Sequence, residues 1–117
     1  MVFPEALTSQ LKAGDNVLKF VELKHGWIAL TEQRVLYSAR MYFSDGSVVT
    51  KTMEHGNLPI EKITSIAVRQ ITKKVCFLKK KFGVAAINMQ GAVYYIIVGK
   101  DTSNVQPLIS EFISRTN

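Results

Sequence analysis

Short apolar stretches separated by two-residue turn signals run through most of this chain, and only its last part changes to a helical repeat. Apolar and polar residues begin to alternate at Asn16, and β-branched and aromatic residues become frequent there. His25-Gly26, Asp45-Gly46 and Gln90-Gly91 each separate two apolar stretches, which is typical of tight β-hairpins. The pattern therefore predicts antiparallel strands that follow one another in sequence order.

About seven strands are expected. They cover residues 17–24, 27–31, 34–43, 48–53, 63–71, 83–89 and 92–98. The third is long enough to bend, whereas residues 56–59 are interpreted as a break between strands. Residues 73–81 are expected to form a hairpin or an extended loop.

A single apolar stripe predicts an α-helix at the end of the chain. Its members lie at i, i+3, i+4, i+7 and i+8, namely Val105, Leu108, Ile109, Phe112 and Ile113. Asn104 is a suitable N-cap, and Pro107 fits the first turn because its missing N–H is harmless there. A short N-terminal helix beginning at Pro4 is also expected, with Phe3, Leu7 and Leu11 at helical spacing.

The expected fold class is mostly β with one C-terminal α-helix. Short connections favour a strongly bent sheet, a sandwich or a partly open barrel, and the helix buries its stripe most simply across an open end. With 117 residues, the chain is expected to form one domain, residues 1–117, without metal or disulfide staples.

Several classes of protein are disfavoured by composition. The longest apolar run, Ala92 to Val98, is too short for a membrane-spanning helix, which needs about 20 residues. The start of the chain lacks the pattern of a signal peptide. A lone Cys76 indicates a reduced core thiol, so we expect a cytoplasmic protein.

Catalytic and metal-binding patterns are not apparent in the sequence. His25 and His55 both lie beside glycines in expected turns, and Cys76 has no motif partner. Ligand spacing for a metal and glycine-rich phosphate loops do not occur either. We therefore expect no enzymatic activity, no cofactor and no metal.

The formal net charge of +6 arises from one third of the chain. Residues 62–100 hold eight basic side chains and no acidic one, whereas the remainder holds seven basic and nine acidic residues. Within this region, five lysines flank the apolar residues 75–78. The expected binding residues are Lys73, Lys74, Phe77, Lys79, Lys80 and Lys81.

Lysines around an apolar patch suit an acidic protein partner or an anionic membrane surface. In a second interpretation, Val75 and Phe77 face the core while the lysines protect a sheet edge. A third is homo-oligomeric assembly through sheet edges. A fourth is weak binding of single-stranded nucleic acid, although Tyr94 and Tyr95 are expected on opposite faces, so at most one could stack on a base.

Three segments resemble the pleckstrin-homology-like (PH-like) domains of bacteria: residues 26–37, 58–66 and 93–98. The similarity covers roughly residues 11–115. It implies a seven-stranded, sharply bent barrel capped by the C-terminal helix, and a non-enzymatic binding or assembly role, with homo-oligomers among some relatives. Eukaryotic relatives hold phosphoinositide around the first hairpin, but here Lys24-His25-Gly26-Trp27 is too short for such a cradle. From the lone cysteine and the lysine-rich segment we expect a cytoplasmic location, with peripheral contact at the inner membrane surface as the alternative.

Overall fold

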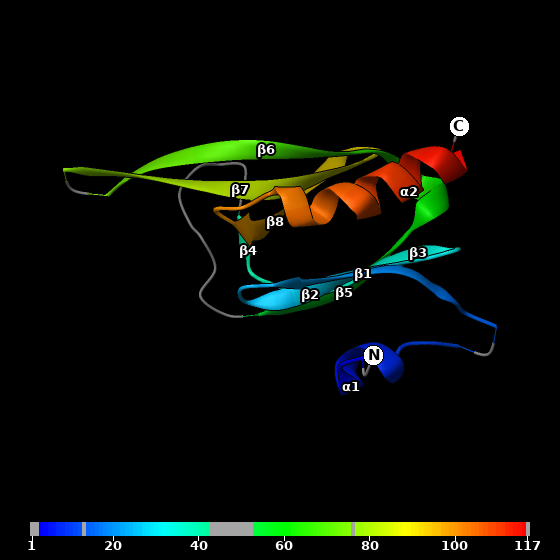
Figure 1. Ribbon diagram of the computed structural model, residues 1–117. Helices are drawn as coiled ribbons and strands as arrows, with labels where there is room; N and C mark the ends of the chain where they lie inside the picture. The colour runs from blue at the N-terminus through cyan, green and yellow to red at the C-terminus, as the bar shows by residue number, and fades with distance from the viewer. Residues whose placement is uncertain (1–2, 13, 43–52, 76, 117) are drawn as a thin grey trace.

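The computed structural model describes residues 3–12, 14–42, 53–75 and 77–116 (Figure 1). The elements in chain order are α1 (Glu5–Thr8), β1 (Val17–Leu23), β2 (Gly26–Thr31), β3 (Arg34–Ala39), β4 (Met41–Tyr42), β5 (Glu54–Pro59), the 3₁₀ turn η1 (Ile60–Lys62), β6 (Ile63–Val75), β7 (Leu78–Met89), β8 (Ala92–Gly99), the 3₁₀ turn η2 (Ser103–Val105) and α2 (Gln106–Thr116).

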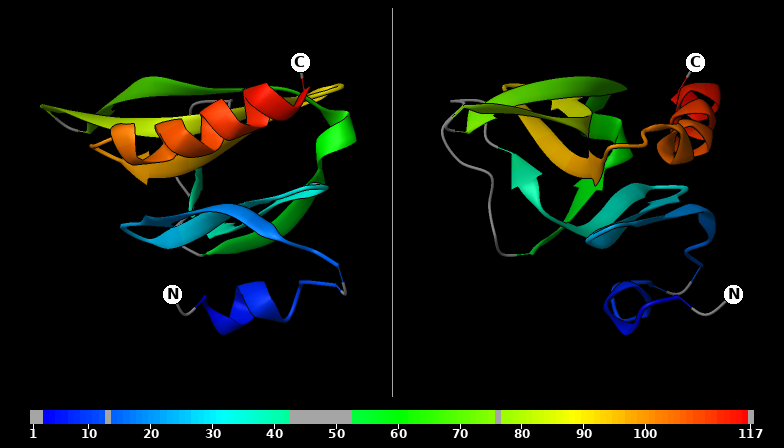
Figure 2. Two further views of the ribbon diagram at one scale, coloured as in Figure 1. Left: turned by 45° about the vertical axis from the view of Figure 1, so that its right-hand side comes forward. Right: turned by 60° about the vertical axis from the view of Figure 1, so that its left-hand side comes forward.

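Two four-stranded antiparallel sheets face each other in the described part of the chain (Figures 1 and 2). The first has the order β1-β2-β3-β5, and the second has the order β4-β8-β7-β6. Only Arg40 separates β3 from β4, so one run of residues bends from the first sheet into the second. The expected bend in the third strand is thus confirmed, and the sheets are arranged as a sandwich.

The main core fills the space between the sheets. Ile28 and Leu30 contribute from the first sheet, and Ile87 and Ile96 contribute from the second. Each is at most 2% exposed, and full burial of such a side chain is worth about 1.5–3 kcal/mol. Strand alternation explains the selection, because every second residue of a strand points to the same face.

Helix α2 lies along an open side of the sandwich (Figure 2). Leu108, Ile109 and Phe112 are buried and belong to the main core, whereas Ile113 is 46% exposed. Pro107 lies in the first turn, as expected. The prediction that Asn104 caps α2 is wrong, because this residue lies inside η2. Just before η2, the Asp101 carboxylate accepts hydrogen bonds from the backbone N–H and the hydroxyl of Ser103.

Two of the expected hairpins are present; the Gln90-Gly91 turn lies where expected, whereas the first turn lies one residue before the expected His25-Gly26. The β1–β2 connection pairs Leu23 with Gly26, and the β7–β8 connection pairs Met89 with Ala92, so each turn contains two residues. Gly26 and Gly91 have φ values of 119° and 81°. Gly91 lies in the β7–β8 turn, whereas Gly26 is the first residue of β2, and the β1–β2 turn is formed by Lys24 and His25. Glycine suits both positions because other residues rarely adopt a positive φ.

The break expected at residues 56–59 is wrong. These residues belong to β5, which pairs with β3 from Arg34↔Pro59 to Ala39↔Glu54. Glycine and proline are tolerated because β5 is an edge strand and Pro59 is its last residue. The strand expected over residues 48–53 lies largely outside the described residues, as does the Asp45-Gly46 turn.

Candidate functional site: a projecting basic hairpin

The β6–β7 hairpin extends past the sheet to which it belongs (Figure 1). Strand β8 ends at Gly99, which is the register partner of Gly83 in β7. Beyond this point, β6 and β7 pair only with each other, from Ile71↔Phe82 to Val75↔Leu78. These five residue pairs span about 16 Å at 3.3 Å per residue. Both strands are longer than the sequence predicted, because the expected strands covered only residues 63–71 and 83–89.

Large apolar side chains are exposed at the tip of this hairpin. Phe77 is 100% exposed and Leu78 is 69% exposed. The interpretation in which Phe77 faces the core is therefore wrong. Phe77 is exposed because the β6–β7 turn lies beyond the end of β8, where the opposite sheet does not cover it. The expected core position of Cys76 lies outside the described residues.

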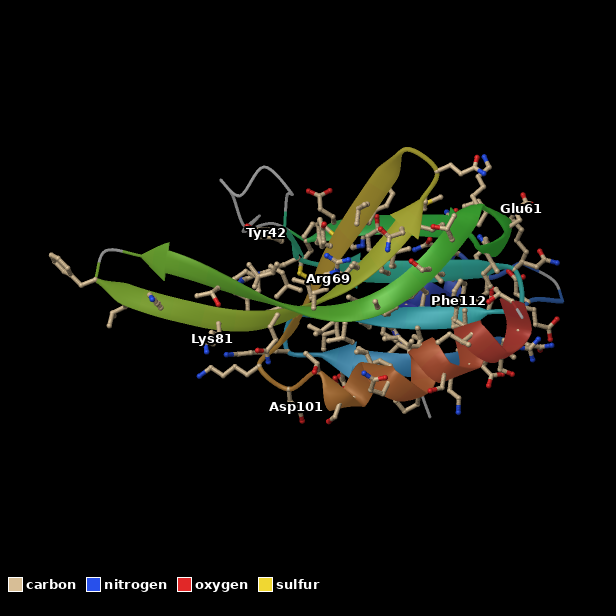
Figure 3. All side chains as sticks on the ribbon, turned by 90° about the horizontal axis from the view of Figure 1, so that it is seen from above. Tyr42, Glu61, Arg69, Lys81, Asp101 and Phe112 are labelled. Carbon is tan, nitrogen blue, oxygen red and sulfur yellow. The ribbon has the colours of Figure 1, made fainter. Side chains whose placement is uncertain are left out.

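Lysines occupy facing positions along the projecting part of the hairpin. Lys73 is the register partner of Lys80, and Lys74 is the register partner of Lys79. Lys81 pairs with Thr72, and the side chains of Lys79 and Lys81 are exposed; Figure 3 shows Lys81 on this part of β7. Like charges at directly opposite positions destabilise a β-hairpin. All five sequence-predicted lysines are thus brought onto one projection, together with Phe77.

Acidic side chains form no ion pair with Lys79 or Lys81 within the described residues. The two ion pairs found there are Arg34–Asp15 and Arg115–Glu111, neither of which involves β6 or β7. An isolated two-stranded hairpin is marginally stable in water. The projection therefore combines weak folding support, concentrated positive charge and an exposed apolar tip.

An aromatic cluster lies where the projection joins the sheet. The ring of Tyr42 is 5.7 Å from that of Phe82 and 6.1 Å from that of Tyr95, centroid to centroid. All three side chains are half-buried. Tyr94 instead packs against the main core, so the expectation that Tyr94 and Tyr95 occupy opposite faces is confirmed. Tyr42 was missed because its pairing with Tyr95 depends on the long-range contact between β4 and β8.

Other chemistry is sparse among the described residues. His25 lies in the β1–β2 turn and His55 in β5, and both are exposed. In residues 3–12, 14–42, 53–75 and 77–116, no group of three His, Cys, Asp or Glu side chains is placed to hold a metal ion. Among those same residues, no helix has the length and apolar character needed to cross a membrane.

Comparisons of this chain with protein-family models, curated proteins and solved structures found no match.

Proposed function

We propose that this protein is a non-enzymatic, PH-like binding module that attaches peripherally to an anionic membrane surface through the β6–β7 hairpin. The observation that carries the proposal is the fully exposed Phe77 at the tip of a lysine-rich projection. The proposed location is cytoplasmic, at the inner membrane surface. The element order, with antiparallel strands followed by one C-terminal helix, supports the PH-like assignment.

Charge and apolar surface act at different depths in this proposal. A lysine close to an anionic membrane contributes about 1 kcal/mol, and the contribution falls off within a Debye length. Phe77 and Leu78 lie beyond the lysines and can enter the boundary between headgroups and acyl chains, which an interfacial apolar group penetrates by about 5–10 Å. A projection of about 16 Å allows this contact while the sandwich remains in water.

The exposed tip favours a membrane over an acidic protein partner or a nucleic acid. An acidic protein or a nucleic acid would bind the lysines through its negative charges, but neither partner requires the side chains of Phe77 and Leu78 to be exposed. Single-stranded nucleic acid would draw instead on the Tyr42, Phe82 and Tyr95 cluster. These rings are half-buried against one another, which leaves less of each face available for stacking.

Sedimentation with lipid vesicles tests the proposal. Wild-type protein is mixed with phosphatidylcholine vesicles or with vesicles that also contain phosphatidylserine, at low and high salt. We expect binding only to the second type, weakened by salt. Replacing Lys79, Lys80 and Lys81 by glutamate removes at least about 3 kcal/mol of attraction, or roughly a hundredfold in affinity.

Two further variants separate the contributions. K19E/K24E/K62E changes the net charge by the same amount at exposed positions outside the hairpin, and we expect a much smaller loss of binding. F77S/L78S keeps every lysine and is expected to lose the binding that persists at high salt. Equal losses in the two charge variants would contradict a hairpin site. Binding of wild type to a single-stranded oligonucleotide or an acidic polypeptide, but not to either vesicle, would overturn the membrane proposal.

A further inference from the structure

Arg40 lies at the bend where the chain passes from the first sheet to the second. Its neighbours Ala39 and Met41 are both buried in the main core. Because successive side chains of an extended chain point to opposite sides, the side chain of Arg40 points to the outer side of the bend. The backbone carbonyl of Arg40 accepts a hydrogen bond from the Ile97 N–H at 2.9 Å, so Arg40 extends the pairing of β4 with β8 by one residue.

A row of residues on the outer face of the second sheet connects Arg40 to Arg69. Ile97 is the register partner of Val84 in β7, and Val84 is the register partner of Arg69 in β6. Register partners lie on the same face of a sheet, and none of these residues belongs to the main core. Figure 3 looks onto this face and labels Arg69. The row spans three strand spacings, or roughly 14 Å, with an arginine at each end and two apolar residues between them.

The Nε atom of Arg40 lacks an acceptor. This nitrogen is buried and has no hydrogen-bond partner among the described residues, although the side chain as a whole is half-buried. A buried N–H donor without an acceptor is unfavourable, and such groups are uncommon in folded proteins. Turning the guanidinium towards an acceptor on the outer face would satisfy this donor. The unpaired Nε therefore indicates an acceptor that the described side chains do not supply.

Counter-charges for the two arginines are also missing from this sheet. Strands β4, β6, β7 and β8 contain no aspartate or glutamate. The two ion pairs found in the described part of the chain involve Arg34 and Arg115 instead. Glu54, the register partner of Ala39, is exposed and forms no ion pair with Arg40. An anion that binds between the arginines would supply both the missing acceptor and the missing charge.

From these observations we infer that Arg40 and Arg69 form a binding site for the phosphate group of a small soluble compound. A planar guanidinium fork matches the oxygens of a phosphate, and two forks match its charge, which is about −1.5 to −2 for a monoester at pH 7. Three acceptor oxygens allow one phosphate to accept hydrogen bonds from both arginines. Val84, which is fully buried, and Ile97 form the apolar floor between them.

The phosphate site is separate from the tip of the hairpin. From the Arg69↔Val84 pair to the Val75↔Leu78 pair, the strands run six residues, or about 20 Å. A tip that enters the membrane boundary by about 5–10 Å thus leaves the arginine row of an upright hairpin above the headgroups. The inference therefore does not depend on the proposed membrane function.

Titration with inorganic phosphate, followed by NMR of the arginine Nε–H groups, tests the inference. Sodium chloride at the same ionic strength is the reference. We expect the Arg40 and Arg69 signals to move along saturating curves with one midpoint. The Arg115 signal should stay in place, because its Nε donates to the Glu111 carboxylate at 3.1 Å.

Three variants separate a site from general charge effects. Arg69→Gln should weaken phosphate binding by about tenfold, because it removes charged hydrogen bonds from an exposed side chain. Arg40→Lys should also weaken it, since lysine keeps the charge but loses the fork. Arg115→Gln is the matched control: it removes one positive charge from α2, and we expect the midpoint to stay unchanged.

Two NMR results would overturn the inference. The first is movement that is linear in phosphate, or equal for Arg115, because it would report ionic strength alone. The second is an Arg40 signal that phosphate does not move, which would leave its Nε without the proposed acceptor.

Vesicle sedimentation shows whether the phosphate site is separate from the membrane contact. Arg69→Gln should retain most of the binding to phosphatidylserine vesicles that is lost when Lys79, Lys80 and Lys81 are replaced by glutamate. An equal loss would place Arg69 in the membrane contact and overturn a separate phosphate site. Saturating phosphate binding without any vesicle binding would support the phosphate site and contradict only the membrane proposal.

Discussion

The aromatic ring of Tyr37 lies across the backbone of Gly56, its register partner in the neighbouring strand β5. A Cβ atom on Gly56 would lie 2.5 Å from the Tyr37 hydroxyl oxygen and 2.6 Å from the ring carbon that bears it. Tyr37 is itself buried in the main core, so its ring cannot swing into solvent without leaving a cavity. The glycine is therefore required by packing between two strands.

Replacing Gly56 by valine should destabilise the fold by about 1–3 kcal/mol, which is typical of a side chain forced into occupied space. Urea unfolding measures the change in the free energy of unfolding. Asn57→Val, at the exposed neighbouring position of the same edge strand, is the control and should have little effect. A loss below about 0.5 kcal/mol for Gly56→Val would mean that Tyr37 repacks without cost.

Burial raises the pKa of the Tyr37 hydroxyl above its ordinary value, and Tyr94 and Glu54 act in the same direction. The folded protein thus holds this proton more tightly than the unfolded chain does. The resulting stability is fully present below about pH 10, the ordinary tyrosine pKa, and is lost as the pH rises through the folded-state pKa. Ultraviolet titration of wild type and Tyr37→Phe should assign the late-titrating tyrosine, and a wild-type curve without a late step would contradict this.

Phe112 on α2 is 3% exposed and packs in the main core. Its replacement by alanine should cost about 3–5 kcal/mol, because the change leaves a cavity between the helix and the sheets. Ile113 follows it on the same helix but is 46% exposed, so Ile113→Ala is the control and should cost far less. Denaturant unfolding of both variants measures the difference, and equal losses would show that α2 is peripheral to the core.

Local patterns in the sequence predicted the fold class, the C-terminal helix and two of the hairpins. They did so because strand alternation and glycine turns are properties of neighbouring residues. Strand β5 was missed because Gly56 and Pro59 resemble a loop when read alone. The ring of Tyr37 explains why a glycine is needed at position 56. The edge position of β5 explains why the strand tolerates Pro59.

The candidate site was predicted by composition but not by shape. The lysines and Phe77 could be selected from charge and hydropathy alone, whereas their projection depends on where β8 ends. That end is set by the pairing of Gly83 with Gly99, a long-range relationship. A second apolar cluster, in which Leu7 of α1 packs onto Trp27 and Leu36 on the outer face of the first sheet, was missed for a similar reason. Trp27 and Leu36 lie in strands with both faces buried, and the sequence did not show which segment covers the outer face.

The pKa of the Asp15 carboxyl is lowered by the hydrogen bond from the Lys12 backbone N–H and by the neighbouring Arg34 guanidinium. A carboxylate with a depressed pKa stabilises the folded state above the unfolded-state value of about 3.9, and this stability is lost as the pH falls through the lower folded-state value. Asp15→Asn should therefore lower the free energy of unfolding at pH 7, and its difference from wild type should shrink below about pH 4. Urea unfolding followed by Trp27 fluorescence across this range measures both. A difference of constant size at every pH would show that the charge of Asp15 does not stabilise the fold.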